Sequence, residues 1–247
     1  MRTATTTTAA AGRPAAATSR ALRRAYHRPV TTVAWVWLVA TAVCAAADWL
    51  VVAIERRRLE YVAKPAVMLA LIGLAVSLTP GSAASDVARP WFIAALGLSL
   101  FGDVLLMLPS ERFVGGLVAF LLAHVAFIVG LVAIIATGGL VVGGVVLGLL
   151  VVGTMVALVG RPIVRAVRVG RPSLVVPVAA YLAVISTMVV AACATGRPLA
   201  MAGAILFYAS DAILAWDRFV GHQRWGRVAT HVTYHTGQAL LVLSLLA

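Results

Sequence analysis

The amino-acid sequence predicts an all-α membrane protein, a polytopic bundle of about eight transmembrane helices. Of its 247 residues, 62% are hydrophobic and 11% are charged, and the mean hydropathy is +1.03. Soluble domains contain roughly 45 to 50% apolar residues, so this composition excludes an ordinary soluble fold. A membrane-spanning helix needs about 20 largely apolar residues, and the chain contains about eight such windows between polar breaks.

The predicted spans are separated by short loops, and prolines lie near many of their ends, where a helix begins or stops. The stretch from Val125 to Gly160 carries no charge and is too long for one span. We therefore divide it at Thr137-Gly138-Gly139, a turn-like sequence. The resulting spans cover residues 31–54, 62–79, 91–108, 113–135, 138–159, 173–194, 199–216 and 228–246.

The remaining sequence suggests one domain and no bound cofactor. Residues 1–30 are rich in Thr and Ala with scattered Arg, which is typical of a disordered basic tail. Residues 31–247 form the single transmembrane domain. Cys44 and Cys193 fall within spans, where they are expected to pack as small apolar side chains. The sequence shows neither the Cys/His spacing of a metal site nor a phosphate-binding glycine motif, so we expect no metal and no cofactor.

The formal net charge of +12 is spread over the tail and the short loops. Nucleic-acid surfaces instead interleave basic and aromatic residues, so we expect membrane lipids as partners and no nucleic acid. Twelve basic residues lie in the loops after the odd-numbered spans, against two in the loops after the even-numbered spans. The positive-inside rule places the odd-numbered loops in the cytosol, although six arginines in the tail oppose this orientation. The sequence predicts no oligomeric state.

Polar side chains inside the spans all fall in the half of the bilayer next to the odd-numbered loops. Asp48, Asp103 and Asp211 lie five or six residues before the ends of their spans, or about 7 to 9 Å deep. Lys64 lies near the start of the second span and His124 halfway along the fourth. Ionisable groups inside a membrane are costly and usually functional. We therefore interpret Asp103 and Asp211 as candidate catalytic residues, whereas Asp48 can simply anchor a helix end.

The last span has one polar face. His231, Tyr234, His235 and Gln238 follow the i, i+3, i+4, i+7 spacing of one side of a helix. This face should point inward, toward a stripe on the fourth span that includes His124. The pattern predicts a polar pocket in an apolar bundle, open toward the odd-numbered loops. Lys64, His124, Tyr234 and Gln238 are the candidate substrate-binding residues.

Five short motifs follow one another along the chain: AKPAVMLAL at 63–71, LSLFGDVLLMLP at 98–109, RFVGGLVAFLLAHVAF at 112–127, LFYASDAILAWDRF at 206–219 and YHTGQALLVLS at 234–244. They resemble, in the same order, the motifs of the YhhN family of membrane proteins, the lysoplasmalogenases. They span roughly residues 60 to 247, and their combination is specific although each is short. The resemblance implies hydrolysis of the vinyl-ether bond of 1-alkenyl lysophospholipids to a fatty aldehyde and a glycerophospho-base. We expect a multi-pass protein of a bacterial plasma membrane.

The candidate residues suit this chemistry when considered independently. Protonation of the β-carbon of a vinyl ether creates an oxocarbenium ion, which water then traps. The reaction needs a general acid, a nearby anion and a positioned water. The sequence alone does not assign the two roles; we prefer Asp211 as the acid and Asp103 as the ionised partner, held by Lys64 or a histidine. Tyr234, His124 and Gln238 would orient water or substrate, and Lys64 with Arg57 or Arg58 would bind the lipid phosphate.

Two other functions remain open from the sequence alone. A lipid or proton-coupled small-molecule transporter also uses intramembrane acids and histidines. Such carriers often have paired repeats and sites at the midplane, and neither feature is evident in this sequence. A lipid-binding or structural protein would have the pocket without the chemistry. The hydrolase interpretation predicts that the site opens toward the cytosol.

Overall fold

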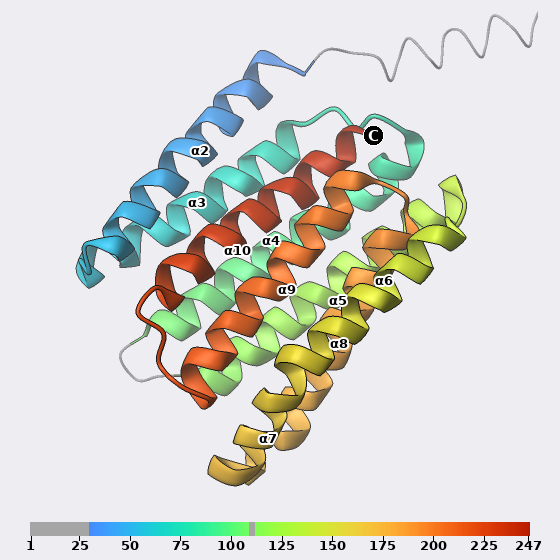
Figure 1. The fold of residues 1–247 in the computed structure, drawn as a ribbon. Helices are drawn as coiled ribbons and strands as arrows, with labels where there is room; N and C mark the ends of the chain where they lie inside the picture. Colours follow the sequence, from blue (N-terminus) through green and yellow to red (C-terminus); the bar gives the residue numbers. More distant parts are fainter. Residues whose placement is uncertain (1–29, 109–111) are drawn as a thin grey trace, which may run out of the picture.

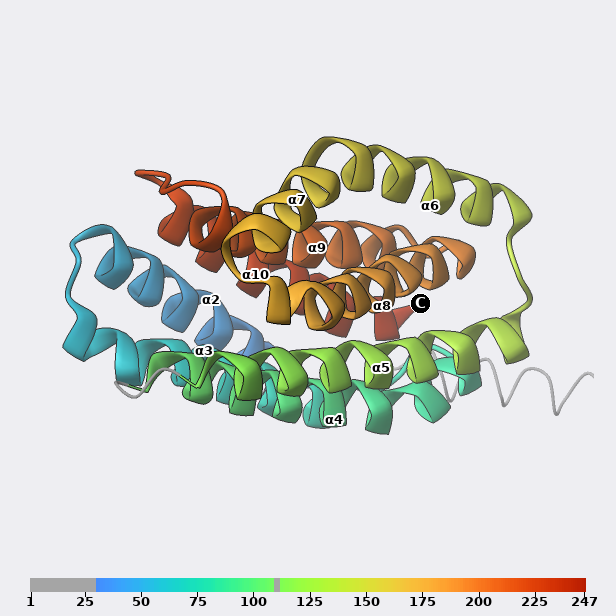
Figure 2. The ribbon, with the colours of Figure 1, turned by 90° about the horizontal axis from the view of Figure 1, so that it is seen from below.

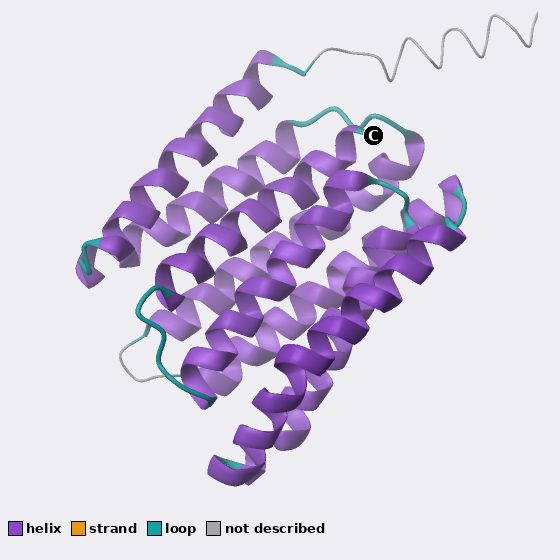
Figure 3. Ribbon diagram, viewed as in Figure 1, coloured by secondary structure: helices purple, strands orange, loops and turns teal. Residues whose placement is uncertain are grey.

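The computed structural model describes residues 30–108 and 112–247 (Figure 1), so nearly all of the predicted tail lies outside the described residues. Figure 3 shows helices joined by loops, and no strand is present in these two ranges. Short π and 3₁₀ turns occur at Val156–Gly160 (η1), Pro172–Leu174 (η2) and Ser244–Leu246 (η3). The α-helices are α2 (Thr32–Ala53), α3 (Arg57–Ser77), α4 (Ala83–Met107), α5 (Phe113–Gly138), α6 (Val142–Met155), α7 (Arg161–Gly170), α8 (Val175–Ala194), α9 (Pro198–Phe219) and α10 (Gly226–Leu243).

The described residues form a polytopic helical bundle, as the composition predicts. Seven helical segments in this part of the chain are long and apolar enough to cross a membrane, with the segment from Val142 to Gly170 counted as one. The eighth predicted span corresponds to α10, which lies alongside the others (Figure 1). Its mean hydropathy is reduced by the buried polar face of His231, Tyr234, His235 and Gln238.

Helix boundaries differ from the predicted ones where proline was taken as a stop. The predicted loop after residue 159 is helical: η1 continues from α6 and leads directly into α7, which ends at Gly170. Pro162 is tolerated because it lies in the first turn of α7, directly after the π turn, where a missing backbone donor costs little. Pro90 lies inside α4, which the Ser82 side chain caps eight residues earlier.

The predicted division of the uncharged stretch from 125 to 160 is confirmed. Helix α5 ends at Gly138, and Gly139 has a φ of 89°. This left-handed conformation is accessible to glycine at little cost. The chain therefore turns at this point and starts α6 at Val142, close to the position that the sequence indicates.

Seven helices close into a ring and α6 packs outside it. Consecutive neighbours around the ring are α2, α3, α4, α5, α8, α9 and α10, and α10 also contacts α2 and α3. Figure 2 shows α3, α4 and α5 in one layer, with α8, α9 and α10 against it and α6 and α7 on the far side of α8 and α9. Buried side chains of α3, α4, α5, α8, α9 and α10 fill the interior.

Helices α9 and α10 approach each other closely through glycine. A Cβ atom built on Gly203 would lie 2.8 Å from the Gly237 carbonyl oxygen, and one built on Gly237 would lie 2.9 Å from the Gly203 carbonyl oxygen. Small residues at such crossings allow helix backbones to pack directly in membrane proteins. This contact fixes α9, which carries Asp211, against α10, which carries Tyr234.

The connections between α2 and α3, α4 and α5, α7 and α8, and α9 and α10 all lie at one end of the bundle (Figure 1). We call this the basic end, because nine of the twenty Lys and Arg residues lie within four residues of these connections. The predicted polar residues therefore do gather in the half of the protein near one surface. The chain is a multi-pass membrane protein, and we propose that its basic end faces the cytosol.

A reporter enzyme fused after Arg171, between α7 and α8, should show cytosolic activity, because the four arginines between 161 and 171 oppose translocation. A fusion after Thr195, in the connection between α8 and α9, should report the opposite side. An external signal after Arg171 with a cytosolic signal after Thr195 would reverse the proposed orientation.

Candidate active site

Asp103 is held inside the bundle by a lysine and a tyrosine from two other helices. Its Oδ1 atom lies 2.8 Å from Lys64 Nζ, and its Oδ2 atom accepts a hydrogen bond of 2.8 Å from the Tyr234 hydroxyl. The Asp103 side chain is fully buried and that of Lys64 is 12% exposed. A charged carboxylate in an apolar interior is costly unless it is paired and hydrogen-bonded. The three side chains therefore form one charge-compensated group, which we call the Asp103 group.

The sequence positions this group through three helices. Lys64 lies in the first half of α3, Asp103 near the end of α4 and Tyr234 in the middle of α10. One turn beyond Tyr234, Gln238 donates a 3.1 Å hydrogen bond to the Ser99 hydroxyl. Gln238 Oε1 is buried without a hydrogen-bond partner among the described residues. This amide oxygen is free to accept a hydrogen bond from a water molecule.

Asp211 has a different environment, with no lysine or arginine paired to it in the described ranges. Its Oδ2 atom accepts a 2.5 Å hydrogen bond from the Tyr181 hydroxyl and lies 3.6 Å from His124 Nε2. Its Oδ1 atom accepts a 3.3 Å hydrogen bond from Ser210. The Asp211 side chain is 16% exposed, so it is more accessible than that of Asp103. We call these four residues the Asp211 group.

His124 forms one hydrogen bond to a described residue, through Nδ1, and this bond leaves its other ring nitrogen, Nε2, facing Asp211. His124 Nδ1 lies 2.5 Å from the Phe120 carbonyl oxygen, and a carbonyl only accepts hydrogen bonds, so Nδ1 carries a hydrogen. In a neutral imidazole, Nε2 would then present a lone pair toward the Asp211 carboxyl group. Two lone pairs facing each other repel, which favours one additional proton on the imidazole or on the carboxyl. The pair is thus a chemically reasonable proton donor.

Aromatic rings lie between the two groups. The Phe207 ring centre is 4.6 Å from that of His124 and 5.3 Å from that of Tyr234. The Phe120 ring is 5.9 Å from Tyr234. A single polar pocket holding all the candidate residues was the expectation from the sequence, and the structure instead has two polar groups in contact with a shared aromatic core. Phe120 belongs to the stripe on the fourth predicted span that also includes His124, so this stripe supplies part of the aromatic core.

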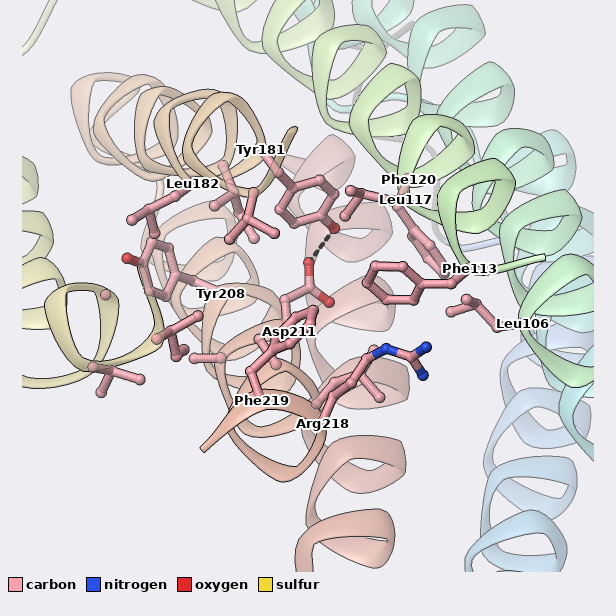
Figure 4. Close-up of a pocket in the computed structure, with 18 residues that line it drawn as sticks. Leu106, Phe113, Leu117, Phe120, Tyr181, Leu182, Tyr208, Asp211, Arg218 and Phe219 are labelled. Carbon is pink, nitrogen blue, oxygen red and sulfur yellow. Dashed lines mark hydrogen bonds between the residues drawn. The ribbon is translucent and has the colours of Figure 1, made fainter. Parts of the chain in front are cut away.

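Two pockets approach these groups from different sides. An apolar pocket of about 80 Å³ lies among α4, α5, η1, α7, α8 and α9 and includes Asp211 and Tyr181. Figure 4 shows the Asp211 carboxyl group pointing toward the Tyr181 hydroxyl, with Phe113 and Phe120 on one side. A polar pocket of about 260 Å³ lies at the basic end and includes Lys64. Leu106 and Leu214 line both pockets, so the two are neighbours.

A third polar cluster connects α2, α3 and α10 beside the polar pocket. His231 Nδ1 lies 2.7 Å from Asp48 Oδ2, and His231 Nε2 lies 3.5 Å from Glu60 Oε1. Glu60 Oε2 accepts a 2.5 Å hydrogen bond from Arg227. Asp48 therefore joins α2 to α10 rather than capping the end of its own helix. The buried polar face predicted for α10 is confirmed, but its residues are shared between this cluster and the Asp103 group.

Several partners in the site were missed by sequence reasoning. Tyr181 lies in an otherwise apolar span, and its position 30 residues before Asp211 gives no periodic signal. Glu60 was taken as part of a loop, whereas it lies in the first turn of α3. Its i, i+4 spacing to Lys64 was an available signal that both side chains share one face. In the described part of the chain, no group of three or more His, Cys, Asp and Glu side chains is arranged to hold a metal ion.

Comparison with protein families matches residues 59–245 to the YhhN family. The chain is 35% identical to lysoplasmalogenase of Mycobacterium tuberculosis over 153 residues, which cover 60% of this chain and 58% of that protein. It is 31% identical over 153 residues to the human lysoplasmalogenase TMEM86B, with 62% of each protein covered, and 44% identical over 75 residues to the rat protein, with 30% of this chain and 32% of that protein covered. The matches thus span about three-fifths or less of these relatives. No solved structure matches the chain.

A double-mutant cycle tests the ion pair of Lys64 and Asp103. Lys64→Met leaves a buried carboxylate without its cation and should destabilise the protein by about 3 to 5 kcal/mol. Adding Asp103→Asn removes the remaining charge and keeps the oxygen that accepts from Tyr234, so the double variant should regain most of that loss. Free energies of unfolding in detergent give both values. A Lys64→Met protein as stable as the wild type would show that the pair is not required for folding.

Proposed function

The chain belongs to the YhhN family, and from this membership and the geometry of the site we propose that it is a lysoplasmalogenase-like hydrolase. Its substrate would be a 1-alkenyl lysophospholipid, and its products a fatty aldehyde and a glycerophospho-base. One observation carries the proposal: Asp211, hydrogen-bonded to neutral donors, lines an apolar pocket next to a polar one that holds Lys64. The names of the mycobacterial and human relatives support the same activity.

The two pockets suit the two parts of a lysolipid. The apolar pocket would hold the portion of the hydrocarbon chain next to the vinyl ether, and the rest of the chain would remain among the lipid-facing helices. The polar pocket at the basic end would hold the glycerophospho-headgroup near Arg57 and Lys64. Leu106 and Leu214, which line both pockets, would then lie beside the bond to be broken. A mostly apolar site with a few convergent polar groups is typical of such ligands.

In the proposed reaction, the Asp211 group donates a proton to the β-carbon of the vinyl ether. The alkene electrons form the new C–H bond, and the α-carbon becomes part of an oxocarbenium ion. Water adds to this carbon and loses a proton, giving a hemiacetal. The hemiacetal collapses to the aldehyde and the free hydroxyl of glycerol, and a proton returns to the Asp211 group. Water is the second reactant, and no oxidant or reductant is needed.

Asp103 plays a supporting part in this proposal. It is fully buried and lines neither pocket, so it would act through Lys64 and Tyr234, which it holds in place, and through its negative charge. Charges in a low-dielectric interior act over longer distances than charges in water. His124 would share the proton with Asp211, and Gln238, which is fully buried and lines neither pocket, would support Tyr234 one turn away on α10.

The activity is tested by comparing three lysolipids that differ only at the first position of glycerol. The purified protein should release fatty aldehyde from the 1-alkenyl compound. The saturated 1-alkyl analogue should bind and remain intact, since it has no alkene carbon to protonate. The 1-acyl compound should be hydrolysed far more slowly. Release of fatty acid from the acyl lipid at a comparable rate would identify an esterase and refute the proposed chemistry.

Substitution of each carboxyl group tests its role. Asp211→Asn and Asp103→Asn should each lower the turnover number by about 10²-fold or more, because general acid catalysis and electrostatic stabilisation each contribute on this scale. Asp86→Asn, an acid-to-amide change at the opposite end of the bundle, is the matched control and should keep full turnover. Near wild-type turnover in a folded Asp211→Asn protein would exclude that residue as the acid.

A further inference from the structure

One face of α3 presents a row of four polar or aromatic side chains to the polar pocket. Arg57, Glu60, Tyr61 and Lys64 all line this pocket and follow the i, i+3, i+4, i+7 spacing of one helical face. A cation stands at each end of the row, with a carboxylate and an aromatic ring between them. Side chains three or four residues apart on a helix are close neighbours. The row spans about 10.5 Å along the helix, and Glu60 and Lys64 place opposite charges one turn apart, a spacing that a small zwitterionic group can match.

The existing ion pairs leave part of this row available. Lys64 is paired with Asp103, and Glu60 Oε2 is paired with Arg227 of α10. The other oxygen of Glu60, Oε1, lies 3.5 Å from the His231 ring nitrogen Nε2. Arg57 is exposed and forms no ion pair with any residue in the described ranges. A carboxylate accepts several hydrogen bonds, so Glu60 can receive a further donor without losing Arg227.

We propose that this row is a subsite for a zwitterionic lipid headgroup and that Glu60 determines its specificity. Lys64, at the buried end of the row, binds the phosphate, and Glu60 Oε1 with the ring of Tyr61, one turn nearer the surface, binds the ammonium group. This assignment rests on the proposed function, because it places a lysolipid headgroup in the polar pocket. Charge-assisted hydrogen bonds suit an ammonium on a carboxylate, and an aromatic face attracts a cation.

The charge of Glu60 separates this subsite from a simple phosphate site. A pocket lined only by Arg57, Lys64 and Arg227 would bind an anionic headgroup, such as phosphoglycerol, at least as well as a zwitterion. A partly buried carboxylate beside the phosphate position disfavours additional negative charge and favours a positive group. The subsite therefore selects phosphoethanolamine over phosphoglycerol.

The test measures binding rather than turnover. Uncleavable 1-alkyl lysolipids with a phosphoethanolamine or a phosphoglycerol headgroup are titrated into the full-length protein in detergent, and the ratio of the two dissociation constants is compared between variants. The wild type should prefer the ethanolamine lipid. Glu60→Gln keeps the shape of the side chain and removes its charge, so this preference should fall about tenfold. Asp86→Asn, at the opposite end, should leave the ratio unchanged.

A second variant shifts the ratio in the other direction. Arg227→Gln frees the second oxygen of Glu60, so the preference for the ethanolamine lipid should rise by roughly threefold. A contribution of Arg227 to phosphate binding cancels in the ratio, because both lipids carry the same phosphodiester. This variant also carries the test if Glu60→Gln does not fold.

Two outcomes overturn the subsite: no preference between the headgroups in the wild type, or a ratio that neither substitution changes. Failure of the proposed function gives a different result, since the vinyl-ether lipid would then survive while the uncleavable lipids still showed the headgroup preference. Binding with the expected ratios and without turnover would therefore retain the subsite and refute only the hydrolysis.

Discussion

The pairing of Asp103 with Lys64 is the constraint on which the interior of this protein depends. A carboxylate buried among apolar helices must be compensated locally, and the Lys64 ammonium and the Tyr234 hydroxyl provide this at 2.8 Å each. The three residues come from α3, α4 and α10, so these helices must lie together. Because α9 packs against α10 through Gly203 and Gly237, the same arrangement places the Asp211 group across the aromatic core.

The two carboxyl groups illustrate how one residue type acquires two chemical characters. Asp103 is paired with a cation and fully buried, whereas Asp211 is bound by neutral donors and a histidine and is partly exposed to a pocket. Pairs of acids with different surroundings are the usual basis of acid catalysis through cationic intermediates. Here the difference follows from which helices face each aspartate. Local sequence plays little part in it.

Polarity is also ordered along the membrane normal. The buried acids and histidines gather near the basic end, Arg197 binds Ser82 and Ser85 at the opposite end, and the interior between them is filled by residues such as Phe92, Phe127 and Leu131. An amphiphile with a polar head and one hydrocarbon chain matches this order, with its head at the surface of the membrane. The neighbouring polar and apolar pockets give the proposed hydrolase and its headgroup subsite a common structural basis.

The sequence alone determined the helical membrane fold, the turn at Gly138 and Gly139, the clustering of polar residues near one surface and the buried face of α10. These features depend on composition, on local turn chemistry or on the period of a single helix, which a window of sequence contains. The tertiary structure decided which side chains meet. Tyr234 reaches Asp103 across 131 residues and Arg227 reaches Glu60 across 167, and Tyr181 joins Asp211 from a span that otherwise looks apolar. It also decided that Asp211 and Lys64 line two different pockets where a single pocket was expected, and that the helix continues past Pro162. Such contacts depend on how whole helices pack. The periodicity of one helix predicts which of its faces is buried, but it does not predict which helix packs against that face.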